Sequence, residues 1–487
     1  MNYTYPGSWL ASKLTGPNQK DIWLLLAGTL WLFLFAAGVQ SYEGSPSVYI
    51  AFSIVFLLLL LSAFHRQRTY VYTYLVIFLW LGYWLKVSYH LVFPYPFVEP
   101  VGRFSGSPAA WDEVLLVPTI AAIGILISRA IFLQLAGRKQ SVLGLKKKYL
   151  PHWLCAYGRW HLAAFLLVLI ATTLANVYYG IFVVGFDVRT ILLWPLNALI
   201  TLMLEGGGFV VWAASILWWR LASGRPVFPF IVLMMVSGAV MTFSTLSRGL
   251  VVFFMLPLLY ALYMNRKKIV DYSKSRLVLI GVLFSVVVVS TFFIVNFIRE
   301  NVYFDKDRLI QTESTPSYAR AFLHFSIDRW VGVEGVMAVS SYPEIGEELL
   351  VKAIFERPRK GNPTIYQRIC PWPASQQFSA LKKNVSLFSL PGGIAFLYYS
   401  GSFAVIFISV ALISLLLQYA ESVIFSFTGN PILCSGVGWL MAITFAHFGG
   451  VPRYVIPVLV FLFVSICLVA VIQSKRTEYL FSTKLRP

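Results

Sequence analysis

Residues 278–297 have the sequence VLIGVLFSVVVVSTFFIVNF, an apolar run of 20 residues without a charged side chain. An α-helix needs about 20 such residues to cross the roughly 30 Å hydrocarbon core of a bilayer. The run therefore predicts a transmembrane helix. Eleven further runs follow the same rule, although two of them, 206–221 and 250–264, are short. These eleven runs are 22–40, 48–64, 70–93, 114–136, 162–185, 206–221, 228–246, 250–264, 394–419, 432–448 and 454–473.

Composition agrees with these runs. Of the 487 residues, 58% are hydrophobic and only 12% are charged, which excludes a disordered chain and an ordinary soluble domain. The net charge of +19 is explained first by basic loops on the cytoplasmic side, so nucleic-acid binding is not expected. The four cysteines are scattered, which supports neither a metal site nor a disulfide framework. We expect an all-α, polytopic membrane bundle of about 12 helices.

The segment 191–205 is ambiguous. It is apolar but contains Pro195 and Asn197, and it ends at Glu205 before three glycines. An interfacial helix that precedes the sixth span fits best, and a long kinked helix is the alternative.

The basic residues predict the orientation. With a cytoplasmic N-terminus, 21 lysines and arginines fall on the inside and only Arg103, Arg189, Arg248 and Arg453 fall in short outer segments. Both termini are therefore predicted to be cytoplasmic. Lys86 and Arg129 lie within spans, near their ends, where they can snorkel.

One outer segment, 299–388, is long and has the composition of a soluble protein. It divides the chain into a first bundle at 1–298, this outer loop, and the final spans with a tail at 389–487. Within the loop we predict a helix at 317–341, a shorter helix at 345–355, and an irregular stretch at 358–375 that is rich in proline and glycine.

The longer predicted helix carries a polar stripe. Arg320, His324 and Asp328 are spaced at i, i+4 and i+8, so they share one face. This face either turns toward a cavity or is merely solvated, with about equal weight for the two. The sequence that follows, Arg329 to Gly335, places Glu334 among glycines that permit close approach of a backbone or a ligand.

Arginines at the outer membrane edge are the most informative residues on that side. Arg248, Arg299 and Arg453 each lie beside the end of a predicted span. A planar guanidinium matches phosphate oxygens in a bidentate manner and stays charged when it is partly desolvated. Each arginine alone is better explained by snorkelling, whereas several that converge would form a diphosphate site.

The stretch Thr242-Phe-Ser-Thr-Leu-Ser-Arg-Gly249, at the end of one span and before another, resembles the signature of the superfamily of O-antigen polymerases and O-antigen ligases. The layout of spans with one late outer loop is similar too. So is the glycine-bearing segment that runs from Leu390 to Gly401. The ligase branch carries a His-Asn pair before the span that follows the loop. The stretch from Lys383 to Phe388 has no histidine, which favours the polymerase branch.

The resemblance implies a GT-C-like glycosyltransferase of the bacterial inner membrane that needs no metal or cofactor. Its donor would be a glycan on undecaprenyl diphosphate, its acceptor another lipid-linked repeat unit, and its product a surface polysaccharide such as that of lipopolysaccharide. The lipid bilayer and, as a candidate, a chain-length regulator protein would be its other partners. An oligosaccharide ligase is the alternative enzyme, and a flippase for lipid-linked oligosaccharides is the alternative outside enzymes.

Such a reaction needs cations for the leaving diphosphate and a base for the attacking hydroxyl. The resemblance assigns the first role to Arg248, and position alone adds the other cations. The base is left open among three residues, and two aromatic residues are candidates for stacking on sugars. The predicted diphosphate residues are Arg248, Arg299, Arg320 and Arg453, the candidate bases are Glu334, Asp328 and His324, and the candidate sugar-binding residues are Trp330 and Tyr398.

Overall fold

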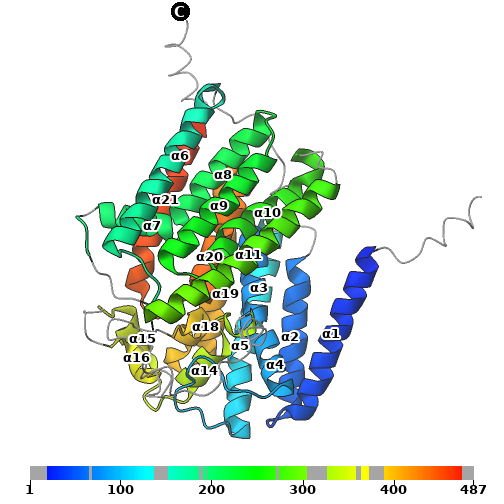
Figure 1. Cartoon of the computed structure of the whole chain (residues 1–487). Coiled ribbons are helices and arrows are strands. Elements are labelled where there is room, and N and C mark those ends of the chain that lie inside the picture. Colours follow the sequence, from blue (N-terminus) through cyan, green and yellow to red (C-terminus); the bar gives the residue numbers. More distant parts are fainter. Residues whose placement is uncertain are drawn as a thin grey trace, which may run out of the picture.

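The computed structural model describes residues 19–64, 69–136, 152–185, 190–193, 195–269, 274–303, 326–357, 363–371 and 389–473. All regular elements in these ranges are helices, so the all-α class is confirmed there. The long helices run side by side in one bundle, and short helices of the predicted outer loop gather at one end of it (Figure 1).

Helix is present in each of the twelve ranges that hydropathy predicts to span a membrane. The corresponding elements are α1 (Gln19–Ser41), α2 (Pro46–Ala63), α3 (Tyr70–Leu79) with the π-helical η2 (Trp80–Leu85) and α4 (Lys86–Val92), α5 (Pro108–Ala136), α6 (His152–Tyr179), α8 (Gly207–Ala222), α9 (Phe228–Thr245), α10 (Leu250–Ile269), α11 (Lys274–Tyr303), α19 (Phe403–Thr428), α20 (Pro431–Ala446) and α21 (Pro452–Gln473).

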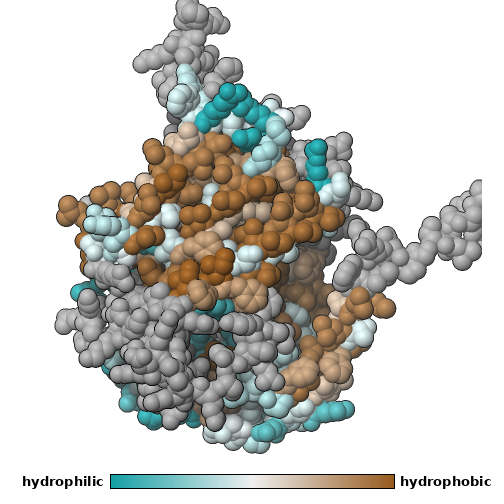
Figure 2. Space-filling view, viewed as in Figure 1, coloured by the Kyte–Doolittle hydropathy of each residue, from teal (hydrophilic) through white to brown (hydrophobic). Residues whose placement is uncertain are grey.

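Length and hydropathy indicate a membrane protein. Within the described residues, seven helices are long and apolar enough to cross a bilayer, or eight if one bent pair forms a single span. Hydrophobic residues cover the side of the bundle as a broad band, and hydrophilic residues lie toward its two ends (Figure 2). The total of twelve spans, the GT-C-like architecture and the orientation of the termini stay predictions.

The bent pair resolves the ambiguous segment before the sixth span. Helix α7 (Leu196–Leu204) and α8 meet at an angle of 65°. The chain turns at Gly206, whose φ of 101° lies in the left-handed region. A Cβ there would also lie 2.4 Å from Cε1 of Phe254, so only glycine fits this corner. The structure thus has a separate helix before the sixth span, as the preferred prediction requires, and the interfacial position of this helix stays a prediction.

The predicted tenth span at 394–419 is placed too early. Its first residues form the short α18 (Gly392–Leu397) and the 3₁₀ turn η4 (Tyr398–Ser400), and the chain then turns at Gly401 with a φ of 67°. The long helix is α19, which begins at Phe403 and ends at Thr428. Glu421, which hydropathy leaves outside the span, is therefore inside it.

In the described part of the chain, three charged side chains are buried in the bundle, and the sequence analysis did not predict this burial. Lys86 is 0% exposed and Arg129 is 4% exposed, so neither of them snorkels. The Arg129 Nη1 atom donates to Thr69 Oγ1 over 3.2 Å and to Gln418 Oε1 over 2.8 Å. Glu421 is 1% exposed, and its two carboxylate oxygens accept from the backbone nitrogens of Tyr70 (2.8 Å) and Val71 (2.7 Å). A carboxylate from α19 thus caps the N-terminus of α3.

This cap makes a testable contribution to stability. Replacing Glu421 with alanine leaves two buried N–H groups of α3 without acceptors, and we expect the free energy of unfolding to fall by about 1–3 kcal/mol per unsatisfied group. Ser426→Ala, on the exposed side of the same helix, is the control. Unfolding in mixed micelles by denaturing detergent measures both. Equal stability of the two variants would contradict the capping role.

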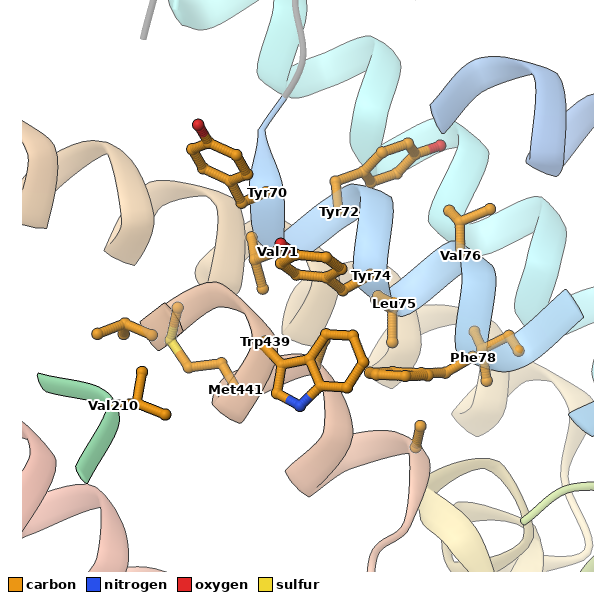
Figure 3. Close-up of a cluster of buried hydrophobic side chains, with 14 of the residues drawn as sticks. Tyr70, Val71, Tyr72, Tyr74, Leu75, Val76, Phe78, Val210, Trp439 and Met441 are labelled. Atoms are coloured by element: carbon orange, nitrogen blue, oxygen red, sulfur yellow. The ribbon is translucent and has the colours of Figure 1, made fainter. Parts of the chain in front are cut away.

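An aromatic cluster joins α3 to α20 in the centre of the bundle. The Trp439 indole lies between Tyr74 and Phe78, with ring centroids 5.0 and 4.8 Å away and edge-to-face geometry in both pairs (Figure 3). Such pairs contribute roughly 0.5–1.5 kcal/mol beyond the burial of their area. They fix α3, and hence its continuation into α4, against the end of α20.

The loop helices differ in part from their predictions. The predicted helix at 317–341 is wrong over 329–332, where the helix is interrupted before α14 (Val333–Ser340), and 317–325 lie outside the described residues. The helix predicted at 345–355 is confirmed as α15 (Glu347–Ile354). The stretch predicted to be irregular contains α16 (Ile365–Ile369), which begins with a capping box between Thr364 and Gln367.

Candidate functional site

The site is built on Lys86, at the point where the π-helical turn η2 becomes α4. The Lys86 ammonium pairs with Glu334 Oε1 of α14 over 2.7 Å. It also donates to the backbone carbonyl of Asp328 over 3.0 Å and to that of Trp330. An ammonium has three N–H donors, so each of them has an acceptor in the loop segment. Lys86 therefore fixes the segment that connects Asp328 to Glu334.

A second attachment lies one turn further along α4. The His90 Nε2 atom is 2.8 Å from Asp328 Oδ1, and the Tyr95 hydroxyl donates to Asp328 Oδ2 over 2.9 Å. The other ring nitrogen of His90, Nδ1, lies 3.2 Å from the Tyr95 carbonyl oxygen. Asp328 thus has both carboxylate oxygens engaged, and its backbone carbonyl is engaged by Lys86.

Two glycines let the segment approach η2 closely. A Cβ on Gly332 would lie 1.9 Å from the Gly82 carbonyl oxygen, and a Cβ on Gly82 would lie 2.3 Å from the Val331 carbonyl oxygen. Any side chain at either position would force the backbones apart. The close approach expected of the glycines in this stretch is therefore present, and it explains why the helix is interrupted before Val333.

The fixed segment presents Arg329 to a group of further arginines. The Arg329 Nε atom is 3.9 Å from the position of a Cβ on Gly249, the neighbour of Arg248 in sequence. The Arg299 Nε atom donates to the Leu246 carbonyl over 2.8 Å, which places Arg299 at the same turn between α9 and α10. Three arginines from separate parts of the sequence therefore meet at this end of the bundle.

Arg329 lies among other charged groups. Burial, and secondly the positive charge of Arg299, lowers the pKa of Arg329, while Glu99 raises it. Arg329 is nevertheless an exposed residue. The nearby Arg248 Nη1 atom donates to Asn296 Oδ1 over 3.2 Å.

Glu99 is a carboxylate whose charge acts on Arg329. It lies in the loop between α4 and α5 and is half-buried. Burial raises its pKa to about 7, and the Glu334 charge raises it as well. Lys86, a hydrogen bond from the Ser389 hydroxyl, and Arg329 act in the opposite direction. Its Oε2 atom is buried and has no hydrogen-bond partner among the residues that the structure describes.

His447 completes the group from the end of α20. The charges of Arg329 and Lys86 act on the His447 side chain. The ring lies 6.2 Å from the Trp330 ring and 6.0 Å from the Phe78 ring. Its Nε2 atom is buried without a partner in the described part of the chain. The charge of Arg329 therefore acts on an imidazole as well as on a carboxyl.

Comparison with known proteins adds no relative: the chain matches no protein-family model, no curated protein and no solved structure. The assignment of this site therefore depends on its own geometry and on the sequence.

The structure brings several of the predicted residues together. Arg248 and Arg299 flank one turn, and Trp330 packs on Phe78 with ring centroids 5.8 Å apart. The two candidate bases, Asp328 and Glu334, are present at the site but are occupied in ion pairs with His90 and Lys86. Their position suits a structural role.

The structure does not bring the remaining predicted residues to this group within the part of the chain that it describes. Arg453 is exposed at the start of α21 and has no hydrogen bond or ion pair with the described residues. Tyr398 is 3% exposed, and its hydroxyl donates to Glu113, so its ring packs inside the protein. Arg320 and His324 lie outside the described residues. No group of three metal-ligating residues occurs in the described part of the chain.

Four residues of the site were missed by the sequence analysis as site residues: Lys86, Glu99, Arg329 and His447. A lysine inside an apolar span is itself a signal, because charge in a span is rare unless it faces a partner. Glu99 carried no such signal, because it lies in a short loop of ordinary composition.

Proposed function

We propose that this chain polymerises oligosaccharide repeat units that are linked to undecaprenyl diphosphate, at the outer face of the bacterial inner membrane. The observation that carries the proposal is the group of Arg248, Arg299 and Arg329 at the turn between α9 and α10, with the charge of Glu99 acting on Arg329. The resemblance of the stretch that ends in Arg248-Gly249 supports the same reaction class.

The proposed chemistry follows from these groups. The acceptor hydroxyl oxygen bonds to the anomeric carbon of the donor while the bond from that carbon to the diphosphate oxygen breaks. The hydroxyl proton moves to the Glu99 carboxylate. The diphosphate leaves with the bonding electron pair, and Arg248, Arg299 and Arg329 stabilise its negative charge.

Lys86 is a positioning residue in this scheme. Its ammonium is 0% exposed and is saturated by Glu334 and two carbonyls, so it acts through the segment that holds Arg329.

Two other functions remain as alternatives. An oligosaccharide ligase would use the same groups with a different acceptor. A flippase for the lipid-linked glycan would need polar sites inside the bundle. The buried Arg129 and Glu421 are such polar groups, but each of them has hydrogen-bond partners within the protein, which favours a structural role for both.

The site predicts a large effect of Arg248→Ala. Loss of one cationic donor from a diphosphate site lowers the rate by about 10²–10³-fold. We expect the variant, expressed in a deletion strain, to give no ladder of long surface glycans on a gel while glycan with a single repeat unit is retained. Arg103→Ala, an exposed outer arginine, is the control.

The same gel separates the alternatives. If the deletion strain lost both the ladder and the surface glycan with a single repeat unit, the protein would be a ligase or a flippase. A normal ladder from Arg248→Ala at wild-type abundance would remove Arg248 from the proposed diphosphate site.

A further inference from the structure

A pair of arginines shares one tryptophan at the turn between α8 and α9. The Arg220 Cζ atom lies 5.6 Å from the centroid of the Trp219 ring, and the Arg225 Cζ atom lies 5.2 Å from it. Arg220 also lies 5.9 Å from the Phe230 ring. The backbone nitrogen of Arg225 donates to the Arg220 carbonyl over 3.1 Å, so the turn itself holds the two side chains near each other.

No acidic residue of the described chain balances these two charges. From Gly206 to Val270 the sequence contains no aspartate or glutamate. No ion pair to either arginine occurs among the described residues, and the charge of Arg225 acts repulsively on Arg220. Two like charges held on one ring by the protein favour the binding of an anion from outside.

Neither guanidinium has all of its hydrogen-bond donors satisfied by the described residues. Arg220 Nη1 donates to the Pro226 carbonyl over 3.2 Å, whereas Arg220 Nε is buried and has no acceptor in the described residues. Arg225 makes no side-chain hydrogen bond in that part of the chain. Each guanidinium has five N–H donors in a planar fork that matches phosphate oxygens.

The turn lies at the opposite end of the bundle from the candidate active site (Figure 1). Helix α9 has 18 residues, about 27 Å, and it joins this turn to Leu246, whose carbonyl accepts from Arg299. Its outward residues, such as Val236 and Val240, are exposed and apolar. An anion with an attached acyl chain could therefore lie along α9.

We propose that Arg220 and Arg225 bind the phosphate of an anionic phospholipid headgroup, in the leaflet opposite to the candidate active site. Trp219 supports both guanidiniums by cation–π contacts, and the exposed face of α9 receives the acyl chains. The site requires no glycosyltransferase activity, so it stands or falls separately from the proposed function.

Native mass spectrometry of the full chain, released from nanodiscs, tests the site. The nanodiscs contain phosphatidylcholine alone, phosphatidylcholine with phosphatidylglycerol, or phosphatidylcholine with inorganic phosphate in the buffer. We expect the wild type to retain phosphatidylglycerol, and Arg220→Gln/Arg225→Gln to retain it about tenfold less, because two charge-assisted contacts are lost. Arg266→Gln/Lys267→Gln removes the same charge from the end of α10 and should retain it as the wild type does.

The outcomes are distinct. Equal retention by the Arg220→Gln/Arg225→Gln variant and the wild type would overturn the proposal, as would equal losses in both double variants, which indicate only a general charge effect. Displacement of the lipid by inorganic phosphate would show a site for free phosphate and overturn the assignment to a headgroup. Melting of each variant in phosphatidylcholine nanodiscs, followed by tryptophan fluorescence, confirms that the comparison is made on folded protein.

Discussion

Replacing Glu99 with glutamine is expected to lower the rate of glycan polymerisation by about 10²–10⁴-fold, the usual contribution of a positioned general base. The amide has nearly the same shape and can still accept the hydrogen bond from Ser389. It cannot accept a proton from the acceptor hydroxyl. The expected result is loss of the glycan ladder with normal abundance of the protein in the membrane.

The direction in which the rate changes with pH also tests Glu99 as the base. Glu99 acts as a base only when it is deprotonated, and burial raises its pKa to about 7. The rate of polymerisation by purified protein in vesicles should therefore rise as the pH increases through about 7 and then level off. The residual activity of Glu99→Gln should lack this step.

The same shift affects stability in the opposite direction. Because the pKa of Glu99 is about 7 in the folded protein, this carboxyl keeps its proton up to about pH 7, whereas in the unfolded chain it loses the proton near its ordinary pKa of 4.5. The folded state thus binds more protons between these values, and the Glu99 contribution to the free energy of unfolding falls as the pH rises through that window. Glu99→Gln removes this contribution.

An exposed glutamate provides the matched control. Glu344→Gln makes the same isosteric change near α15, at the same end of the bundle. It should leave the ladder and the pH profile unchanged. Wild-type activity of Glu99→Gln at normal abundance would exclude Glu99 as the base. Asp328 or Glu334 would then have to act as the base after release from its ion pair.

Hydropathy predicted the positions of the long helices well, because the apolar character of a helix can be recognised from consecutive residues alone. The break at Gly401 escaped it, because apolar residues continue on both sides and only the left-handed φ of 67° reveals the turn. The end of the helix before Val333, within the long outer loop, was not predicted for another reason. The interruption before Val333 depends on contact between Gly332 and Gly82, which are far apart in the sequence.

The sequence predicted the part of the site that lies near the ends of helices. Arg248 and Arg299 follow the ends of predicted spans, and the structure places both of them at one turn, while their position at the membrane edge stays a prediction. The partner of Lys86 could not, because Glu334 lies 248 positions later and becomes adjacent only when the bundle forms. For the same reason the candidate bases Asp328 and Glu334 looked available in the sequence, although ion pairs occupy both in the structure.

The Lys86–Glu334 pair leads to the second large effect. Replacing Lys86 with methionine leaves the Glu334 carboxylate, 3% exposed, without its countercharge. Loss of one partner of a buried ion pair usually costs about 3–5 kcal/mol of the free energy of unfolding. The carbonyls of Asp328 and Trp330 lose their donor as well. We expect markedly earlier unfolding by denaturing detergent and loss of the glycan ladder.

The double variant Lys86→Met/Glu334→Met separates stability from positioning. It removes both charges, and a buried ion pair replaced by apolar side chains of similar volume often regains the lost stability. We therefore expect a coupling energy in the double-mutant cycle and unfolding close to that of the wild type. The ladder should stay absent, because without the Lys86 ammonium no donor holds the Asp328 and Trp330 carbonyls that flank Arg329. If the double variant polymerised normally, the pair would serve folding alone, and the position of Arg329 would depend on the contacts of Asp328 with His90 and Tyr95.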